Sequence, residues 1–485
     1  MNYKLIGKIL SFILFIEIGL LVPPLLISAV SGDTNVTFSF LKTIALLAAA
    51  GGLLYILTRK STPRMYAKEA LVTTGLSWII MSFFGCLPFV FSGVIPHLAD
   101  AFFEVASGFT TTGASILSSV EDLPRALLFW HSFSHWIGGM GVLVFLMAIL
   151  PLSNTGNGYT LRILRAESPG PVVGKLTPKM SSTAQILYLI YFGLTMLDAV
   201  LLKCGGLSWF DAFCLAFGTA ATGGFGVVND SFMSYSPYII NVTTVFMFIF
   251  SINFSLYYLL LMKQFKAFFK DEEKRLFLII VGASIALITW NILGMYSSWN
   301  EALRHAAFQV ATVTSTSGFT SADFDQWPAL SKTILLCLMC MGACAGSTGG
   351  GFKVSRILLL MRNAKRNIKQ YQHPQGVEVI KMNGQRIDEQ TIASTNVYLS
   401  VYVAIAIASL LVISLDGFST ETNISAVIAC LNNIGPGFAA VGPTANYAGY
   451  SVLSKIVLSF DMLLGRLEIL PILVLFVPRT WKKHS

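Results

Sequence analysis

Long apolar segments separated by short polar turns run along almost the whole chain of 485 residues. Many of these segments exceed the about 20 residues that an α-helix needs to cross a hydrocarbon core. They lack the alternation of apolar and polar positions, over about ten residues, that is typical of strands in a membrane barrel. Because backbone polar groups in lipid must be satisfied within helices or a closed barrel, the pattern predicts an all-α integral membrane protein.

The apolar segments fall into an N-terminal two-helix hairpin and four repeated units. The hairpin comprises 9–30 and 41–58, and a basic stretch follows it. Each unit then consists of a spanning helix, a short helix that ends in a glycine turn, and a second spanning helix. The paired spans are expected at 69–95 and 126–151, 183–202 and 237–262, 276–297 and 329–361, and 393–415 and 451–477, with short helices at Asp100–Thr110, Trp209–Ala220, Asn300–Val313 and Glu421–Leu431. We therefore divide the chain into a transmembrane hairpin and four pseudo-symmetric helix–pore-loop–helix units around one pore, at 1–68, 69–182, 183–275, 276–392 and 393–485, with cytoplasmic links ending the first and third units.

Every one of these short helices is too short to cross a bilayer and runs directly into its glycine turn. The four turns read Phe109-Thr-Thr-Thr-Gly-Ala-Ser115, Thr219-Ala-Ala-Thr-Gly-Gly-Phe225, Thr314-Ser-Thr-Ser-Gly-Phe-Thr320 and Leu431-Asn-Asn-Ile-Gly-Pro-Gly437. Alignment on the glycine brings together Gly113, Gly223, Gly318 and Gly435. Helix capping explains a single glycine of this kind, but not four at equivalent positions of a repeat. We expect four re-entrant pore loops around one ion path.

Composition and charge agree with a membrane protein and set its orientation. Hydrophobic residues make up 54% of the chain, charged residues 12%, and the mean hydropathy is +0.69, which excludes an ordinary soluble protein. Arg466 falls within the predicted membrane and six basic residues fall on one side of it, while all the other Lys and Arg fall on the opposite side; the six are Lys42, Arg125, Lys203, Arg304, Lys332 and Lys455. The positive-inside rule places the loaded side and both termini in the cytoplasm, so the glycine turns enter from outside. This topology accounts for the net charge of +9 without a nucleic-acid partner.

The glycine turns carry the groups that a dehydrated monovalent cation requires. Such an ion needs a ring of oxygens in place of its water, and backbone carbonyls supply them where glycine permits the conformation. The negative, C-terminal ends of the four short helices would point at the ion path. The predicted ion-binding residues are Thr111, Thr112, Gly113, Ala221, Thr222, Gly223, Thr316, Ser317, Gly318, Asn433, Ile434 and Gly435. In the fourth segment Asn432, Asn433 and Ile434 replace hydroxyl residues, so we expect its side chains to contribute little and its carbonyls to suffice.

These turns resemble the filter segments of a known family, the Trk/Ktr/HKT superfamily of potassium transporters, and most closely its TrkH branch. The resemblance rests on Thr-Thr-Thr-Gly-Ala, Ala-Thr-Gly-Gly-Phe, Ser-Thr-Ser-Gly-Phe-Thr-Ser-Ala-Asp-Phe and Asn-Asn-Ile-Gly-Pro-Gly-Phe, and it covers nearly the whole chain, including the hairpin. It implies potassium as the substrate, because a glycine in all four filters goes with potassium selectivity in that family. It also implies a bacterial cytoplasmic membrane, a homodimer and a separate cytoplasmic regulatory ring protein that binds nucleotide (TrkA-like). No organic cofactor is expected in this chain.

A second glycine cluster, Gly342–Lys353, interrupts the expected span 329–361. Each glycine costs about 1 kcal/mol relative to alanine in a helix interior, so the cluster predicts a break at mid-membrane. Irregular backbone at that depth is tolerated where it lines a cavity or is buried in protein. The resemblance implies an intramembrane gate formed by Gly346, Ser347, Thr348, Gly349, Gly350 and Gly351. A phosphate-binding loop does not fit, because the required spacing of glycine and Lys-Ser/Thr is absent.

Arg466 is a charged residue in a predicted membrane segment. An arginine at membrane depth is costly unless it has partners, and it marks a functional site by default. The resemblance implies a place near the centre of the pore, where the guanidinium could bond to carbonyls of the gate loop and repel idle cations. Pairing with Asp461 or Glu468, which would tie helices together, is the alternative.

Conduction of potassium through a single-file filter with a loop gate is the function that the pattern favours. A carrier that couples potassium to a proton or a sodium ion is the alternative, although carriers favour inverted repeats and these four units share one direction. No nucleophile, base and metal ligands converge in the sequence, so we expect no enzymatic activity. His131 and His135 have the i, i+4 spacing of metal ligands, but without a third ligand we expect them to be packing residues.

Overall fold

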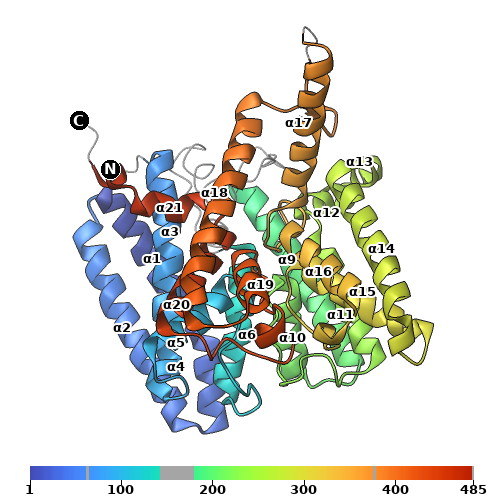
Figure 1. Cartoon of the computed structure of the whole chain (residues 1–485). Helices are drawn as coiled ribbons and strands as arrows, with labels where there is room; N and C mark the ends of the chain where they lie inside the picture. The colour runs from blue at the N-terminus through green and yellow to red at the C-terminus, as the bar shows by residue number, and fades with distance from the viewer. Residues whose placement is uncertain (62–64, 142–179, 375–377, 483–485) are drawn as a thin grey trace.

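The computed structural model describes residues 1–61, 65–141, 180–374 and 378–482 (Figure 1). Within these ranges all regular structure is helical except one antiparallel hairpin, β1 (Lys381–Met382) and β2 (Gln385–Arg386). Six of the described helices are long and apolar enough to cross a membrane, and one bent pair is a seventh candidate. The predicted all-α membrane class is therefore confirmed. The second half of the span expected at 126–151, and most of the link expected after it, lie outside the described residues.

The N-terminal segments form a helical hairpin beside the rest of the fold (Figure 1). Its helices, α1 (Tyr3–Ser31) and α2 (Thr34–Thr58), are joined at Gly32, whose φ of 73° lies in the left-handed region. Asp33 caps α2 by accepting a hydrogen bond from the amide of Val36. The two helices pack against each other, and α1 also contacts α3 and α6 of the first unit.

The remaining helices follow the order expected for four units. The first contains α3 (Ala67–Gly85), α4 (Leu87–Ser92), α5 (Leu98–Phe109) and α6 (Arg125–Met140), and the second contains α9 (Met180–Cys204), α10 (Trp209–Ala221), α11 (Pro237–Ser251), α12 (Phe254–Leu261) and α13 (Phe265–Lys270). The third contains α14 (Glu272–Ile292), η1 (Leu293–Met295), α15 (Trp299–Ser315), η2 (Phe324–Gln326), α16 (Ala329–Met341) and α17 (Val354–Gln372). The fourth contains α18 (Glu389–Ile413), η3 (Ser414–Asp416), α19 (Thr420–Leu431), η4 (Ala439–Val441), α20 (Val452–Arg466), α21 (Leu470–Phe476) and η5 (Pro478–Trp481).

Four of these helices, α5, α10, α15 and α19, are the short helices that the sequence predicts, and we refer to them as the pore helices. Each has an acidic residue in its first turn, where the positive end of the helix dipole stabilises it: Asp100, Asp211, Glu301 and Glu421. Three begin at a serine whose hydroxyl accepts an amide hydrogen bond: Ser208, Ser298 and Ser419. The residues of each last turn are buried almost without exception. All four helices therefore run from a polar start to a buried end.

The second span of the second unit is broken, contrary to expectation. α11 and α12 meet at an angle of 92°. The side chain of Asn253 caps α12 at this break by accepting a hydrogen bond from the amide of Ser255. The prediction of one continuous span at 237–262 is wrong. Hydropathy is averaged over a window of residues, so it does not detect a single side-chain hydrogen bond that can end a helix.

The second spans of the third and fourth units are broken as well. The glycine cluster separates α16 from α17, as predicted. α20 and α21 are separated at 467–469, where Glu468 and Ile469 adopt φ angles of 53° and 72°. The continuous span expected at 451–477 is therefore also wrong. Pro471, which lacks an amide hydrogen, opens α21 after the break.

One end of the molecule carries both chain termini, α13 and the projecting part of α17 (Figure 1). α17 brings basic residues to this end, among them Arg362, Lys365, Arg366 and Lys369. The positive-inside rule assigns this end to the cytoplasm. The orientation itself stays a prediction.

Candidate functional site

The four pore helices end in the same backbone structure. After each helix, one amide closes the turn by donating to the carbonyl five residues earlier: Thr112 to Ser107 (2.9 Å), Gly223 to Gly218 (2.8 Å), Ser317 to Thr312 (2.8 Å) and Ile434 to Ala429 (2.9 Å). The residue before each of these amides is left-handed, with φ of 55° at Thr111, 56° at Thr222, 63° at Thr316 and 55° at Asn433. The glycine after it also has positive φ: 78° at Gly113, 92° at Gly224, 75° at Gly318 and 96° at Gly435. A turn of this shape therefore occurs four times.

This repeat corrects the alignment of the second segment by one position. Gly224, not Gly223, is equivalent to Gly113, and Gly223 matches Thr112 instead. Ala221 is the last residue of α10 and falls outside the equivalent set. In the sequence, either of the two adjacent glycines could be aligned with Gly113. The Gly-Phe pairs at Gly224 and Gly318 are the sequence feature that identifies Gly224 as the equivalent residue.

The four glycines lie against one another's segments in a closed ring. A Cβ atom built at Gly113 would lie 2.2 Å from the carbonyl oxygen of Gly223, and one built at Gly224 would lie 2.2 Å from that of Ser317. At Gly318 the corresponding distance is 2.1 Å to the carbonyl oxygen of Ile434, and at Gly435 it is 2.7 Å to that of Thr112. Each glycine thus contacts the residue that precedes the next glycine, and the last contact closes on the first segment. No side chain has room at these four positions.

Side-chain hydroxyls fix the turns from within. The hydroxyls of Thr110 and Thr112 are 2.8 Å apart, and those of Ser315 and Ser317 are 2.7 Å apart. In the fourth segment the amide nitrogen of Asn433 donates to the Thr112 hydroxyl (2.9 Å) and to the Met462 carbonyl (2.8 Å). Asn433 therefore joins the fourth segment to the first through its side chain, and the expectation that the carbonyls of this segment suffice for an ion stays a prediction.

Two histidines of α6 brace the outer arms of the first two segments. His135 lies with Nδ1 2.7 Å from the carbonyl oxygen of Gly108, and its Nε2 accepts from the amide of Phe225 at 3.3 Å. His131 stacks on the Phe225 ring and lies 2.6 Å from the carboxylate of Glu104. Glu104 in turn accepts hydrogen bonds from the Ser115 hydroxyl and the Ile116 amide, both at 2.8 Å. The histidines are therefore packing residues, as predicted, and they lie behind the first two glycine turns. Glu104 is a bracing residue that the sequence analysis missed.

A cavity of about 170 Å³ opens on the outer side of the ring. Its lining includes the four equivalent glycines, Gly113, Gly224, Gly318 and Gly435. The buried hydroxyl of Tyr447 also lines it and donates to the carbonyl of Gly435 at 2.7 Å. The ring therefore forms the floor of a polar vestibule.

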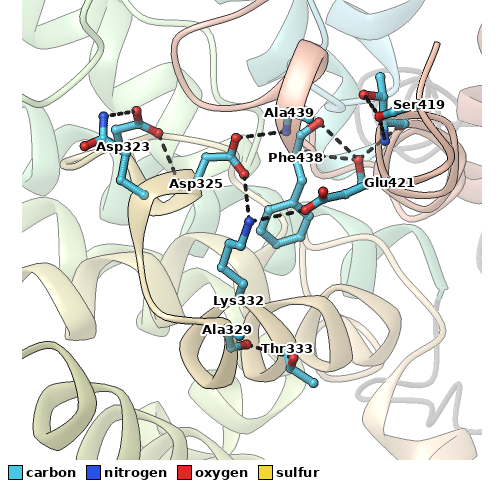
Figure 2. Close-up of polar contacts among 12 residues, drawn as sticks. Asp323, Asp325, Ala329, Lys332, Thr333, Ser419, Glu421, Phe438 and Ala439 are labelled. Atoms are coloured by element: carbon cyan, nitrogen blue, oxygen red, sulfur yellow. Dashed lines mark hydrogen bonds and ion pairs between the residues drawn. The ribbon is translucent and has the colours of Figure 1, made fainter.

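A polar cluster joins the third and fourth units beside this vestibule (Figure 2). Asp325, in η2, accepts a hydrogen bond from the amide of Ala439 at 3.1 Å. The ammonium group of Lys332 lies between the carboxylates of Asp325 (3.5 Å) and Glu421 (3.3 Å), as Figure 2 shows. Ala439 has a φ of 54° and follows Gly435 of the fourth segment by four residues. The cluster therefore holds the outer arm of that segment against the third unit.

The glycine cluster between α16 and α17 lies directly under the ring. The amide of Gly350 donates to the hydroxyl of Thr316 at 2.7 Å. A Cβ atom at Gly350 would lie 2.5 Å from the carbonyl oxygen of Asn432, and one at Gly349 would lie 2.7 Å from that of Ser315. Gly346 and Ser347 are less buried than the residues from Thr348 to Gly351. This segment, 346–351, which we call the gate loop after its predicted role, therefore packs against the buried ends of α15 and α19.

Arg466 connects the gate loop to the first unit. Its guanidinium donates to the carbonyl of Thr348 (2.7 Å) and to those of Gly138 and Gly139 at the end of α6 (both 2.5 Å). Asp461 instead accepts from Ser409 at 2.8 Å, and Glu468 pairs with Arg356. These contacts therefore do not support the alternative prediction that Arg466 pairs with Asp461 or Glu468. The predicted bond to a gate-loop carbonyl is present.

This arrangement excludes several kinds of site and defines another. Within the described ranges no group of three or more His, Cys, Asp and Glu residues could hold a metal ion. Four buried helix ends instead present backbone carbonyls around one axis inside a helical membrane fold. Such a fold and site define a helical membrane transport protein.

Comparisons with known proteins identify the family. Residues 36–483 match the family described as TrkH, cation transport protein. The chain is 35% identical to the Trk system potassium uptake protein TrkH of Salmonella typhimurium over the full length of both, and 29% identical to TrkG of Escherichia coli over 99% of both. A crystal structure of the potassium transporter TrkH from Vibrio parahaemolyticus matches with a TM-score of 0.88 and 31% identity, over 99% of this chain and 100% of that one. The chain belongs to the TrkH family.

Because Gly224 is the residue equivalent to Gly113, we expect a side chain at Gly224 to destabilise the protein. Gly224→Ala should lower the apparent melting temperature of the purified protein as strongly as Gly113→Ala does, because both put a Cβ within 2.2 Å of a carbonyl oxygen at positive φ. Gly226→Ala is the matched control, since its nearest Cβ contact is at 3.4 Å. Equal melting temperatures for Gly224→Ala and Gly226→Ala would contradict the assignment.

The polar cluster of Asp325, Lys332 and Glu421 should restrict the motion of the backbone around Ala439. Asp325→Ala leaves the Ala439 amide without its carboxylate acceptor, so hydrogen exchange in peptides that cover 436–442 should become faster. Glu421→Gln serves as the control, because Lys332 keeps Asp325 and the Ala439 bond is untouched. Unchanged exchange in Asp325→Ala, measured by mass spectrometry, is the result that counts against this role.

Proposed function

We propose that this protein takes up potassium across the bacterial cytoplasmic membrane through a single-file filter of backbone carbonyls. The observation that carries the proposal is the closed ring of Gly113, Gly224, Gly318 and Gly435. The relatives named as potassium uptake proteins span the full length of the chain, which supports potassium as the substrate. Both termini would then lie in the cytoplasm.

The ring can replace the water around a potassium ion. Each segment offers carbonyl oxygens before and at its glycine, and the left-handed residue before them turns the backbone so that successive carbonyls can face one axis. The C-terminal end of each pore helix adds a partial negative charge. The proposed ligands are the carbonyls of Thr111, Thr112, Gly113, Thr222, Gly223, Gly224, Thr316, Ser317, Gly318, Asn433, Ile434 and Gly435.

The gate loop would control the flow below this filter. It is buried against Thr316 and Asn432, so it occupies the space that an ion leaving the filter has to cross. Arg466 holds its Thr348 carbonyl and contributes a positive charge that repels a cation. Movement of the loop would open the path without changing the filter.

Regulation would come from a partner on the cytoplasmic side. We expect a separate nucleotide-binding ring protein (TrkA-like), a homodimer of this chain and no organic cofactor within it. The printed names of the relatives place them in a Trk system, which supports a partner of this kind.

Coupled symport of potassium with a proton or sodium ion is the second candidate. The breaks between α11 and α12, α16 and α17, and α20 and α21 favour it, because carriers bind ions where membrane helices are broken. The four pore helices favour the pore, because all of them run from a polar start to a buried end and none is inverted.

Reconstitution into liposomes distinguishes the two candidates. For a pore, currents should reverse at the potassium equilibrium potential whatever proton or sodium gradient is imposed, because each potassium ion crosses alone. Liposomes without protein provide the control. A reversal potential that shifts with the second gradient would establish coupling and reject the pore.

Shortening the gate loop tests its role. Deletion of Gly346–Gly351 should raise potassium flux in the absence of any partner and leave the preference for potassium over sodium intact, since the loop bonds to the Thr316 hydroxyl and not to the carbonyls of the ring. Gly282→Ala on α14, where a Cβ meets nothing within 4 Å, is expected to behave as wild type. Unchanged flux in a folded deletion variant would remove the loop from the mechanism.

A further inference from the structure

Glu273, in the first turn of α14, lies at the base of the gate loop. Its side chain is only 4% exposed. One carboxylate oxygen, Oε1, accepts hydrogen bonds from the amide of Ala345 at 2.7 Å and from the amide of Ser355 at 2.9 Å. Ala345 immediately precedes the loop and Ser355 follows it, so a single oxygen fixes both ends.

The two acidic neighbours of Glu273 face a different structure. Asp271 and Glu272 bind Asn383 in the β1–β2 hairpin, and Glu272 also pairs with Arg362 of α17 at 2.9 Å. Both contacts lie on the surface, away from the loop. The role of Glu273 therefore does not follow from the acidic cluster as a whole.

Burial makes the contacts of Glu273 energetically significant. A buried carboxylate loses its water and needs hydrogen-bond donors in exchange. A buried acceptor that is left without its donors costs the full desolvation penalty of the group, and here both donors belong to the segment that carries the loop. Movement of the loop away from α14 would leave a carboxylate and two amides unpartnered at once.

Other contacts hold the loop at different points. Arg466 binds its Thr348 carbonyl, and the break between α11 and α12 binds it through the Gly346 carbonyl, which accepts from the amide of Phe254 at 2.9 Å. Lys353 donates from its ammonium group to the carbonyl of Gly349. Backbone hydrogen bonds also join the two sides of the loop, from the amide of Lys353 to the carbonyl of Met341 (3.0 Å) and from the amide of Val354 to the carbonyl of Ala343 (3.1 Å). Glu273 differs from all of these contacts because it attaches both sides of the loop to α14.

The geometry points to Glu273 as a positioning residue that holds the gate loop in its closed position, through the two amide hydrogen bonds at the loop ends. This role rests on the proposed function of the loop as a gate. Glu273 touches neither the ring nor the vestibule, so it sets how often the path opens and leaves the choice of ion unchanged.

Partner-independent potassium flux of the full-length protein in liposomes tests this role. Glu273→Leu keeps the bulk of the side chain and removes the acceptor, so we expect basal flux to rise about tenfold, the equivalent of losing one net hydrogen bond. Glu273→Gln keeps an oxygen acceptor, and its flux should stay within about twofold of wild type. Glu272→Gln is the matched control from the same turn and should leave flux unchanged.

A second variant guards against misfolding of Glu273→Leu. Ser355→Pro removes the donor and keeps the carboxylate, and proline is tolerated in the first turn of a helix such as α17. It should raise basal flux with potassium-over-sodium selectivity retained, whereas a merely damaged fold would lose selectivity and melt at a lower temperature.

The results of these experiments distinguish the role of Glu273 from the proposed function of the loop as a gate. If deletion of Gly346–Gly351 raises flux while Glu273→Leu and Ser355→Pro do not, the gate stands and the role of Glu273 is rejected. Flux raised equally by Glu273→Gln and Glu273→Leu would also reject it, because the acceptor would then be irrelevant. If the deletion itself leaves flux unchanged, the gate fails and this inference fails with it.

Discussion

The structure depends on the close approach of four backbone segments at one axis. Each equivalent glycine lies against the carbonyl group before the next glycine, at a distance that leaves no space for a Cβ atom. Four separate turns of different sequence must therefore adopt one backbone shape. This constraint explains why Thr111, Thr222, Thr316 and Asn433 all accept the left-handed conformation, which is costly for residues with a side chain.

The surrounding elements meet the demands that this approach creates. Pore helices must end inside the protein, so their last carbonyls need partners, and the recurring turn hydrogen bonds supply part of them. The second helices of three units are broken, and polar groups at the breaks bond across units, as where the amide of Phe254 donates to the carbonyl of Gly346. Arg466 is the clearest example, because one guanidinium satisfies carbonyls of α6 and of the gate loop.

The filter and the gate loop are joined through few atoms. Thr316 belongs to the ring through its backbone and to the loop through its hydroxyl. The loop is held from above by this contact, from the side by Arg466 and from below by Glu273. Under the proposed function, a change at the end of the molecule that carries α17 would release the loop without disturbing the carbonyl ring, so flow and selection would be controlled separately.

Sequence patterns predicted the elements well and their local geometry less well. The second pore helix was expected at Trp209–Ala220 and ends at Ala221, because capping residues and a buried apolar face mark its ends. The register of Gly223 and Gly224 was missed, since letters do not record φ angles. The breaks at Asn253 and Glu468 were missed because each depends on a few polar atoms inside an apolar window.

The bonds of Arg466 to Gly138 and Gly139, and those of Glu104, could not be deduced from the sequence either, although the bond of Arg466 to the loop 346–351 was expected. Both residues bind groups that are distant along the chain, and only the packing of separate units brings them together. The glycine cluster was predicted correctly as a break, because its composition alone is incompatible with a stable helix. Composition therefore predicts where backbone departs from a helix more reliably than it predicts what that backbone contacts.

The most direct test of this account is the position of bound ions in an experimental density map of the protein in rubidium or thallium, either of which can stand in for potassium. The account predicts density on the axis of the ring, coordinated by the carbonyl oxygens of Thr112, Gly223, Ser317 and Ile434 and bounded by Gly113, Gly224, Gly318 and Gly435. Ion density confined to side chains elsewhere in the protein, with the ring empty at saturating ion concentration, would contradict it.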